Sequence, residues 1–149
     1  MAVGERSIHI ERPPEEVFAF VGDAANNPRW RSNAVRTEWL DDGPMRVGRV
    51  GRQTSHVLGR DWGVEAEVVE WDPPRLVAWR TVQGPIDVRS RFRVEPDGTG
   101  SRLTIGAEGG FTGPLGPLLT RLAVPKMIKD AEADLVKLRA YLEGGGDRA

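Results

Sequence analysis

The chain contains no cysteine, which excludes disulfides, thiolate nucleophiles and cysteine-ligated metals. No apolar run approaches the length of about 20 residues that a membrane-spanning helix needs. The opening residues, Met1 to Arg6, are followed by no apolar stretch of the kind found in signal peptides. These absences predict a soluble, cytoplasmic protein, and a reducing compartment agrees with the missing cysteine.

A strong excess of either charge is also missing. With 21 basic and 22 acidic side chains the formal net charge is -1, whereas nucleic-acid-binding domains usually carry a pronounced basic face. The sequence therefore predicts no nucleic-acid partner. A chain of 149 residues with 39% hydrophobic content is long enough to bury one core without disulfides or metals. We expect a single domain over residues 1–149 with an ordered core over about 5–143.

The chain does contain a clear period-two pattern. Over residues 86–95, apolar or small residues occupy the even positions and charged residues the odd positions, which is typical of a strand with one buried face. A shift of one residue would bury three arginines, so the register of this strand is fixed. Glu65 and Glu67 are expected to lie across from this arginine row and to form ion pairs with it on a solvated face.

Similar segments lie before and after this strand. They are separated by turn-forming residues, such as Gly59-Arg60, Asp72-Pro73-Pro74 and Gly84-Pro85. We expect further strands over residues 5–11, 35–41, 49–58, 61–71, 75–83 and 101–108. Short connections between consecutive strands predict an antiparallel meander, because parallel strands need long crossovers.

A short helix is predicted directly after the first strand. Pro13 and Pro14 are tolerated in a first helical turn, where a backbone donor is not needed, and Glu15 suits the positive end of a helix. A second short helix or turn is expected over residues 24–30. Together these two segments would close one end of the sheet.

A long helix is predicted at the end of the chain. Its apolar residues recur at helical spacing and form one stripe, which comprises Val124, Ile128, Ala131, Leu135, Leu138 and Leu142. The helix is expected to end near Glu143, before Gly144-Gly145-Gly146. Pro125 is expected to separate or kink a segment over residues 115–123, which would cover the mouth of a cavity.

Several motifs occur in a characteristic order along nearly the whole chain. They are Pro13-Pro14-Glu15-Glu16-Val17-Phe18, Asp23 with Trp30, Gly48, Val69 to Leu76, and Leu135, Leu138 and Leu142. In this order the chain resembles the helix-grip superfamily of START and polyketide-cyclase-like proteins, and within it the bacterial polyketide cyclase/dehydrase or lipid-transport-like branch. The resemblance implies an α+β fold, in which a curved antiparallel sheet of about seven strands wraps around the C-terminal helix and leaves an apolar cavity.

Such a cavity would be lined by one face of the sheet and by the inner face of the long helix, with a volume of about 300 to 1,000 Å³. The candidate lining residues are Gln53, Ser55, Val77, Trp79, Thr81, Val88, Ser90, Phe92, Ile105, Leu122, Ile128 and Ala131. For the apolar members, ordinary core packing is the simpler interpretation, and the binding role depends on the architecture.

Ser90 differs from its neighbours because it is the polar residue on an otherwise apolar strand face. A buried hydroxyl needs a hydrogen-bond partner, and the lack of one costs about 1 to 3 kcal/mol. That partner is either the backbone or a bound water, or a polar group of a ligand. Gln53 and Ser55 would add a second polar point if they also face inward.

Support for catalysis is thin. His9 and His56 lie far apart in the sequence, fit no metal-ligand or triad pattern, and are predicted on the surface. Asp61 is better explained as a turn residue than as a general base. The glycine-rich stretch 106–117 lacks the Lys-Ser/Thr ending of a phosphate-binding loop and is predicted to be a flexible hinge. We therefore expect no metal and no cofactor.

The sequence thus predicts a protein that holds a hydrophobic or amphipathic small molecule in an internal cavity. A polyketide cyclase, aromatase or dehydratase is the first alternative, and it requires an ionisable group in the cavity, which the sequence alone does not locate. A protein-interaction module is the second alternative, and it requires an exposed apolar patch.

Overall fold

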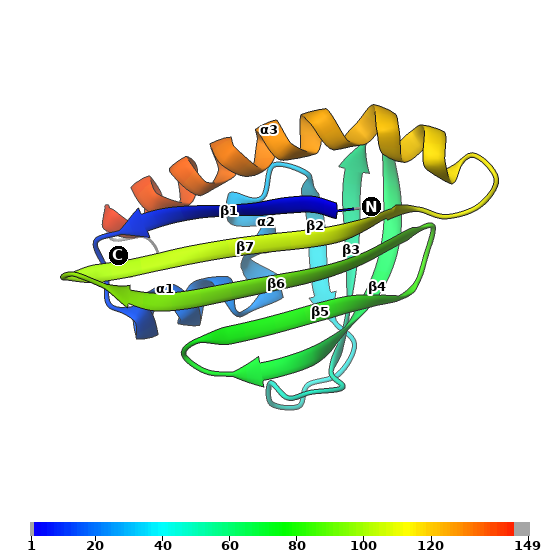
Figure 1. Ribbon diagram of the computed structural model, residues 1–149. Helices are drawn as coiled ribbons and strands as arrows, with labels where there is room; N and C mark the ends of the chain where they lie inside the picture. Colours follow the sequence, from blue (N-terminus) through cyan, green and yellow to red (C-terminus); the bar gives the residue numbers. More distant parts are fainter. Residues whose placement is uncertain (1, 145–149) are drawn as a thin grey trace.

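The computed structural model describes residues 2–144 and contains an antiparallel sheet of seven strands in the order β1-β7-β6-β5-β4-β3-β2 (Figure 1). The strands are β1 (Ala2–Ile10), β2 (Ala34–Trp39), β3 (Val50–Val57), β4 (Arg60–Asp72), β5 (Leu76–Gln83), β6 (Ile86–Asp97) and β7 (Gly100–Phe111). The helices are α1 (Pro14–Val21), the 3-10 turn η1 (Ala24–Asn26), α2 (Asn27–Trp30) and α3 (Gly116–Glu143). The predicted α+β helix-grip fold, its meander and its closing helices are confirmed.

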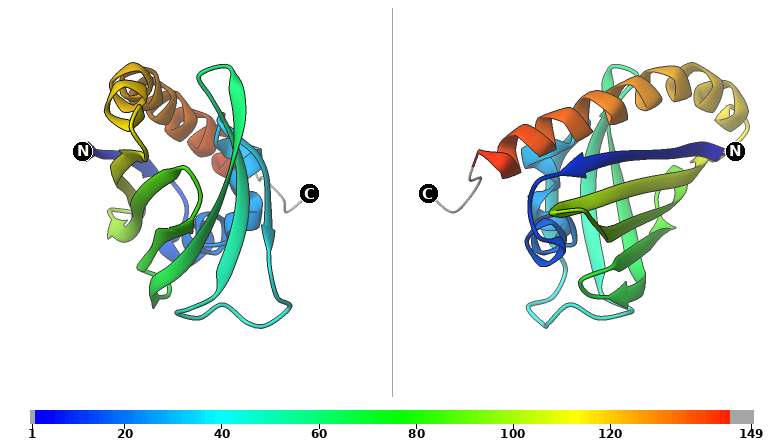
Figure 2. Two further views of the ribbon diagram at one scale, coloured as in Figure 1. Left: turned by 90° about the vertical axis from the view of Figure 1, so that its right-hand side faces the viewer. Right: turned by 60° about the vertical axis from the view of Figure 1, so that its left-hand side comes forward.

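The sheet curls, and α3 runs across its open side (Figure 2). The main core cluster forms where the first helices and the second half of α3 meet the sheet, and it includes Trp30, Val94 and Leu138. A smaller cluster, which includes Val57 and Ala123, lies near the start of α3. Residues of both clusters border the hollow described below, so the fold buries its apolar faces at two places and leaves space between them.

Local sequence explains how α1 forms and where it packs. Pro14 occupies the first turn, where its missing N–H costs no helical bond. Glu15 and Glu16 lie in the same turn, at the positive end of the helix. Val17 and Phe18 are among the buried residues of this helix and join the main core cluster. The helix therefore seals one end of the curled sheet.

The arginine row of β6 faces outward as predicted, but its predicted ion pairs with Glu65 and Glu67 are wrong. Glu65 pairs with Arg52 of β3 at 2.8 Å, and Glu67 pairs with Arg80 of β5 at 3.2 Å. The reason is the strand order: β5 lies between β4 and β6, so Glu65 and Glu67 meet cations on the strands next to β4. Glu70 of β4 does reach across β5 to Arg91 of β6, at 3.4 Å.

The glycine-rich stretch is not a hinge, because residues 106–111 continue β7. A Cβ atom at Gly110 would lie 2.5 Å from Thr120 Oγ1, so only glycine lets α3 approach β7 so closely. The Thr120 hydroxyl accepts a hydrogen bond from the Phe111 amide at 2.9 Å and donates one to the Gly116 carbonyl at 2.8 Å. These contacts attach the first turns of α3 to the sheet.

The last helix is continuous from Gly116 to Glu143 with Pro125 inside it, so the predicted separation of residues 115–123 is wrong. The predicted change of direction is present as a bend, which Figure 1 shows near the yellow start of α3. Thr120 fixes this segment to β7, and the helix tolerates the proline by bending. Gly145 and Gly146, part of the predicted stop signal, lie outside the described residues.

Hydrogen exchange should reveal the effect of Pro125 within α3. Proline has no N–H to offer the carbonyl four residues before it, so we expect amides of residues 118–124 to exchange faster than those of residues 130–140. Pro125→Ala restores that donor, which is worth about 1 kcal/mol. Exchange in the first segment should then slow about fivefold while the second stays unchanged. Equal protection of both segments in the unmodified chain would contradict this view of α3.

Candidate functional site

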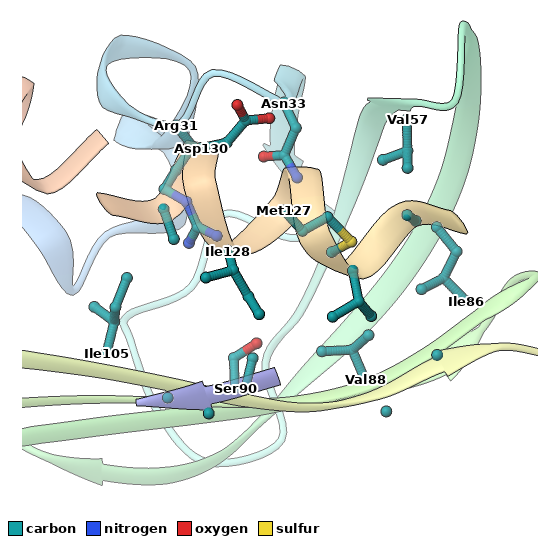
Figure 3. Close-up of a pocket in the computed structure, with 18 of the residues that line it drawn as sticks. Arg31, Asn33, Val57, Ile86, Val88, Ser90, Ile105, Met127, Ile128 and Asp130 are labelled. Carbon is teal, nitrogen blue, oxygen red and sulfur yellow. The ribbon is translucent and has the colours of Figure 1, made fainter. Parts of the chain in front are cut away.

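A hollow lies between α3 and the concave face of the sheet, and it consists of two adjoining compartments. The helix-side compartment, shown in Figure 3, has a volume of about 90 Å³ and is bordered by Ala123 and Ile128 of α3. The sheet-side compartment has a volume of about 180 Å³ and extends to Gln53 on β3. Ser90 and Phe92 of β6 border both compartments.

Both compartments are smaller than the volume expected from the resemblance. Large side chains project into the space: Trp79 and Phe92 meet edge to face with ring centroids 4.9 Å apart, and Met127 projects toward the sheet from α3 (Figure 3). The predicted cavity is therefore present, but aromatic and sulfur-containing side chains occupy part of it.

All but two of the predicted lining residues border the hollow. Those that do are Gln53, Ser55, Trp79, Thr81, Val88, Ser90, Phe92, Ile105, Ile128 and Ala131. Their positions follow from period-two alternation on the strands and from the helical stripe of α3. Their role in binding a ligand stays a prediction.

Val77 and Leu122 do not border either compartment. Val77 is 0% exposed and packs within the main core cluster, one step along β5 from Trp79 on the same face. Leu122 is 59% exposed, because the continuous helix turns it outward. It forms an exposed apolar row with Leu115 and Leu118. The assignment of Val77 and Leu122 to the cavity lining is therefore corrected.

The sheet-side compartment contains a hydrogen-bonded polar group centred on Gln53. The Gln53 Oε1 atom accepts hydrogen bonds from Asn27 Nδ2 at 3.0 Å and from Thr37 Oγ1 at 3.1 Å. Its Nε2 atom donates to Ser55 Oγ at 3.0 Å. Both predicted polar residues of β3 thus face inward, and the sequence interpretation missed Asn27 and Thr37.

Arg31 is the most unusual lining residue, and it was missed from the sequence. It follows α2 directly, and its backbone N–H donates to the Asn27 carbonyl at 2.8 Å. Its side chain borders both compartments, and Figure 3 shows the guanidinium directed toward the space between Ile128 and Ser90. The guanidinium carbon lies 5.1 Å from the ring centroid of Trp30. This places a cation at the wall of a mostly apolar hollow.

Asp134 of α3 is the acidic neighbour of Arg31. It is 4% exposed, and its Oδ2 atom lies 3.9 Å from Arg31 Nε. The same carboxylate accepts hydrogen bonds from the Ser32 backbone N–H at 3.1 Å and from the Ser32 hydroxyl at 3.3 Å. Burial lowers the pKa of Arg31, and the attraction of Asp134 opposes that shift. The pair supplies the ionisable groups that sequence reasoning did not locate.

Three polar groups of the hollow have no hydrogen-bond partner among the described residues. The Nε1 atom of Trp79 and the Nε atom of Arg31 are buried donors without an acceptor, and Asn27 Oδ1 is a buried acceptor without a donor. Ser90 also borders both compartments with its hydroxyl directed into the space in Figure 3. Such groups are rare in folded proteins, and here they border space that a ligand or water could occupy.

Both histidines lie on the surface as predicted, away from the hollow. His9 forms hydrogen bonds with Glu11 and with Asp97, and these bonds raise the pKa of His9. His56 Nδ1 lies 2.8 Å from an oxygen of Asp61, and both side chains are largely exposed. Within residues 2–144, no group of three or more acidic or histidine side chains is placed to hold a metal ion. No helix in that range is long and apolar enough to cross a membrane.

Comparison with known proteins agrees with this architecture. A family model described as "Polyketide cyclase / dehydrase and lipid transport" matches residues 1–143, whereas a search of curated proteins found no match. Among solved structures, a Thermus thermophilus protein is similar with a TM-score of 0.76 and 20% identity, covering 91% of this chain and 93% of that one. A START superfamily protein from Mycobacterium smegmatis is similar with a TM-score of 0.72 and 17% identity, and the match covers 97% of this chain and 96% of that one. The Zhui aromatase/cyclase from a Streptomyces species is similar with a TM-score of 0.70 and 17% identity, and the match covers 95% of this chain and 96% of that one.

Proposed function

The chain belongs to the polyketide cyclase/dehydrase and lipid transport family, and from this premise we propose that it binds a hydrophobic or amphipathic small molecule in the hollow between α3 and the sheet. The observation that supports this most is the lining of the hollow. It is mostly apolar, with a few convergent polar groups from Arg31, Trp79 and Ser90, the composition expected of a small-molecule site. A fully packed core would leave no such space.

Two measurements test the binding proposal directly. Native mass spectrometry of the protein isolated from its own host should show a retained ligand of low mass. Titration with an environment-sensitive apolar dye should give saturable binding, which a small apolar molecule displaces. A protein with no retained mass and no saturable dye binding would contradict the proposal. The exposed row of Leu115, Leu118 and Leu122 would then favour the protein-interaction alternative.

Ser90→Ala should separate binding from stability. The change leaves Cβ in place and removes only the hydroxyl of a residue that borders both compartments. If that hydroxyl contacts the ligand, affinity should fall by about fivefold, which corresponds to one neutral hydrogen bond. The melting temperature should stay level or rise, because a polar group is removed from mostly apolar surroundings. Thr81→Val is the matched control: it borders the sheet-side compartment, but its hydroxyl is already bonded to the backbone of Val88.

An enzyme of the cyclase or dehydratase type is the second candidate, and the Arg31 and Asp134 pair favours it. A guanidinium at the wall of an apolar hollow can stabilise negative charge on a carbonyl oxygen, as an enolate or phenolate forms. Asp134 fixes the position of that guanidinium and is itself held by Ser32. Turnover of a poly-β-carbonyl substrate, lost in Arg31→Met, would support this candidate over passive binding.

A further inference from the structure

We propose that the ligand of this hollow carries a carboxylate, and that Arg31 binds that group. This inference rests on the proposed binding function and names the chemical class of its ligand. The guanidinium borders both compartments and lies near two aromatic rings, 5.1 Å from the centroid of Trp30 and 5.8 Å from that of Phe92. These rings restrict where the guanidinium can move and leave it directed into the hollow (Figure 3).

The Nε donor of Arg31 is not used by the part of the chain that the structure describes. It is buried and has no acceptor among residues 2–144, and Asp134 Oδ2 lies 3.9 Å away. That distance is too long for a hydrogen bond. Asp134 is moreover already bonded to Ser32. A planar guanidinium with free donors is the group that binds a carboxylate in two-point fashion.

The other acidic side chain near the hollow does not compensate Arg31. Asp130 borders the helix-side compartment, but its carboxylate pairs with Lys126 at 2.8 Å. Burial lowers the pKa of Arg31 by more than the attraction of Asp134 raises it, and a further anion beside the guanidinium would favour its charged form. An anionic ligand supplies that charge in surroundings of low polarity, where a charge-assisted hydrogen bond is strong.

Trp79 supplies a second, independent observation. Its side chain is only 9% exposed and borders the sheet-side compartment, and its Nε1 donor has no partner within residues 2–144. Phe92 packs against both residues that carry these donors. Its ring centroid lies 4.9 Å from that of Trp79 and 5.8 Å from the guanidinium carbon of Arg31. We therefore infer a compact apolar acid whose carboxylate meets Arg31 and whose body packs beside Phe92. An additional oxygen on that body would meet the Trp79 donor.

Three naphthalene probes of similar size test this inference on the full chain. They are 2-naphthoate, which is anionic, 2-acetylnaphthalene, which is neutral, and 2-(aminomethyl)naphthalene, which is cationic at pH 7.5. Isothermal titration calorimetry should show 2-naphthoate binding about tenfold more tightly than 2-acetylnaphthalene, and the cation binding most weakly. Arg31→Met should abolish the preference for 2-naphthoate and leave the affinity for 2-acetylnaphthalene within about twofold. Arg31→Lys should keep part of the preference.

Arg80→Gln is the matched control, because Arg80 lies on the outer face of β5 and pairs with Glu67. It should leave all three affinities unchanged. Equal binding of the anionic and neutral probes to the unmodified chain would overturn the carboxylate inference and leave the binding function standing. If none of the three probes binds, the proposed function fails as well. Because the probe comparison needs no variant, it remains decisive even if Arg31→Met does not fold.

Discussion

Asp134→Ala should lower the free energy of unfolding by about 3 kcal/mol, a large loss for a substitution that enlarges no apolar core cavity. The carboxylate is 4% exposed and accepts hydrogen bonds from the backbone and the hydroxyl of Ser32. It is also the counter-charge of Arg31. Its removal leaves the Ser32 N–H without its carboxylate acceptor and the Arg31 cation without its partner, and both are costly. Urea denaturation followed by circular dichroism measures the change.

Asp130→Ala is the control for this prediction. Asp130 lies one turn earlier on α3, and its pair with Lys126 is at the surface, where the lysine side chain is 76% exposed. Its loss should cost less than about 0.5 kcal/mol. The double variant Arg31→Met with Asp134→Ala should recover part of the loss, because no uncompensated charge then remains. Equal small costs for the two aspartates would show that Asp134 does not hold the α2–β2 connection against α3.

The importance of Asp134 links the fold to the proposed site. Ser32 directly follows Arg31, so the carboxylate that holds Ser32 also determines where Arg31 enters the hollow. A fold that buries a charged pair here gives up stability that an apolar pair would supply. In the binding function proposed above, the benefit is a cation fixed at the wall of an apolar space, where it selects the charge of the ligand.

The strand pattern allowed the inner face of β6 to be predicted correctly. Val88, Ser90 and Phe92 alternate with arginines, and a period of two assigns each residue to a face without knowledge of the tertiary structure. The helical stripe of α3 placed Ile128 and Ala131 in the same way. Periodic elements carry this information locally, which is why most of the lining could be predicted.

The residues that the sequence did not reveal lie where no period applies. Arg31 is in a short connection after Trp30, and a lone arginine in a loop is usually solvated. Its burial depends on α3 bringing Asp134 to the same place from a distant part of the chain. Leu122 was misplaced for a related reason: the contact of Thr120 with β7, which fixes the rotation of the helix, has no local signature. Tertiary contacts decide these positions.

Phe92→Ala should lower the free energy of unfolding by about 3 kcal/mol and change what the protein binds. Phe92 is 3% exposed and meets Trp30 and Trp79 edge to face, with ring centroids 5.8 Å and 4.9 Å apart respectively. A Phe→Ala change at a packed position costs about 3 to 5 kcal/mol. We expect the lower end of that range, because Phe92 already borders two empty compartments and loses fewer contacts.

Phe18→Ala is the matched control for Phe92→Ala, since Phe18 is also 3% exposed but borders neither compartment and packs against Trp71 at 5.3 Å. It should cost about 4 to 5 kcal/mol and leave dye affinity unchanged in the folded fraction. Removing Phe92 instead joins the two compartments, so a bulkier apolar dye that binds the unmodified chain weakly should bind this variant more tightly. Thermal denaturation and dye titration of both variants provide the comparison. Equal destabilisation by the two changes, with dye binding unaltered in both, would show that Phe92 is ordinary core and that the binding site lies elsewhere.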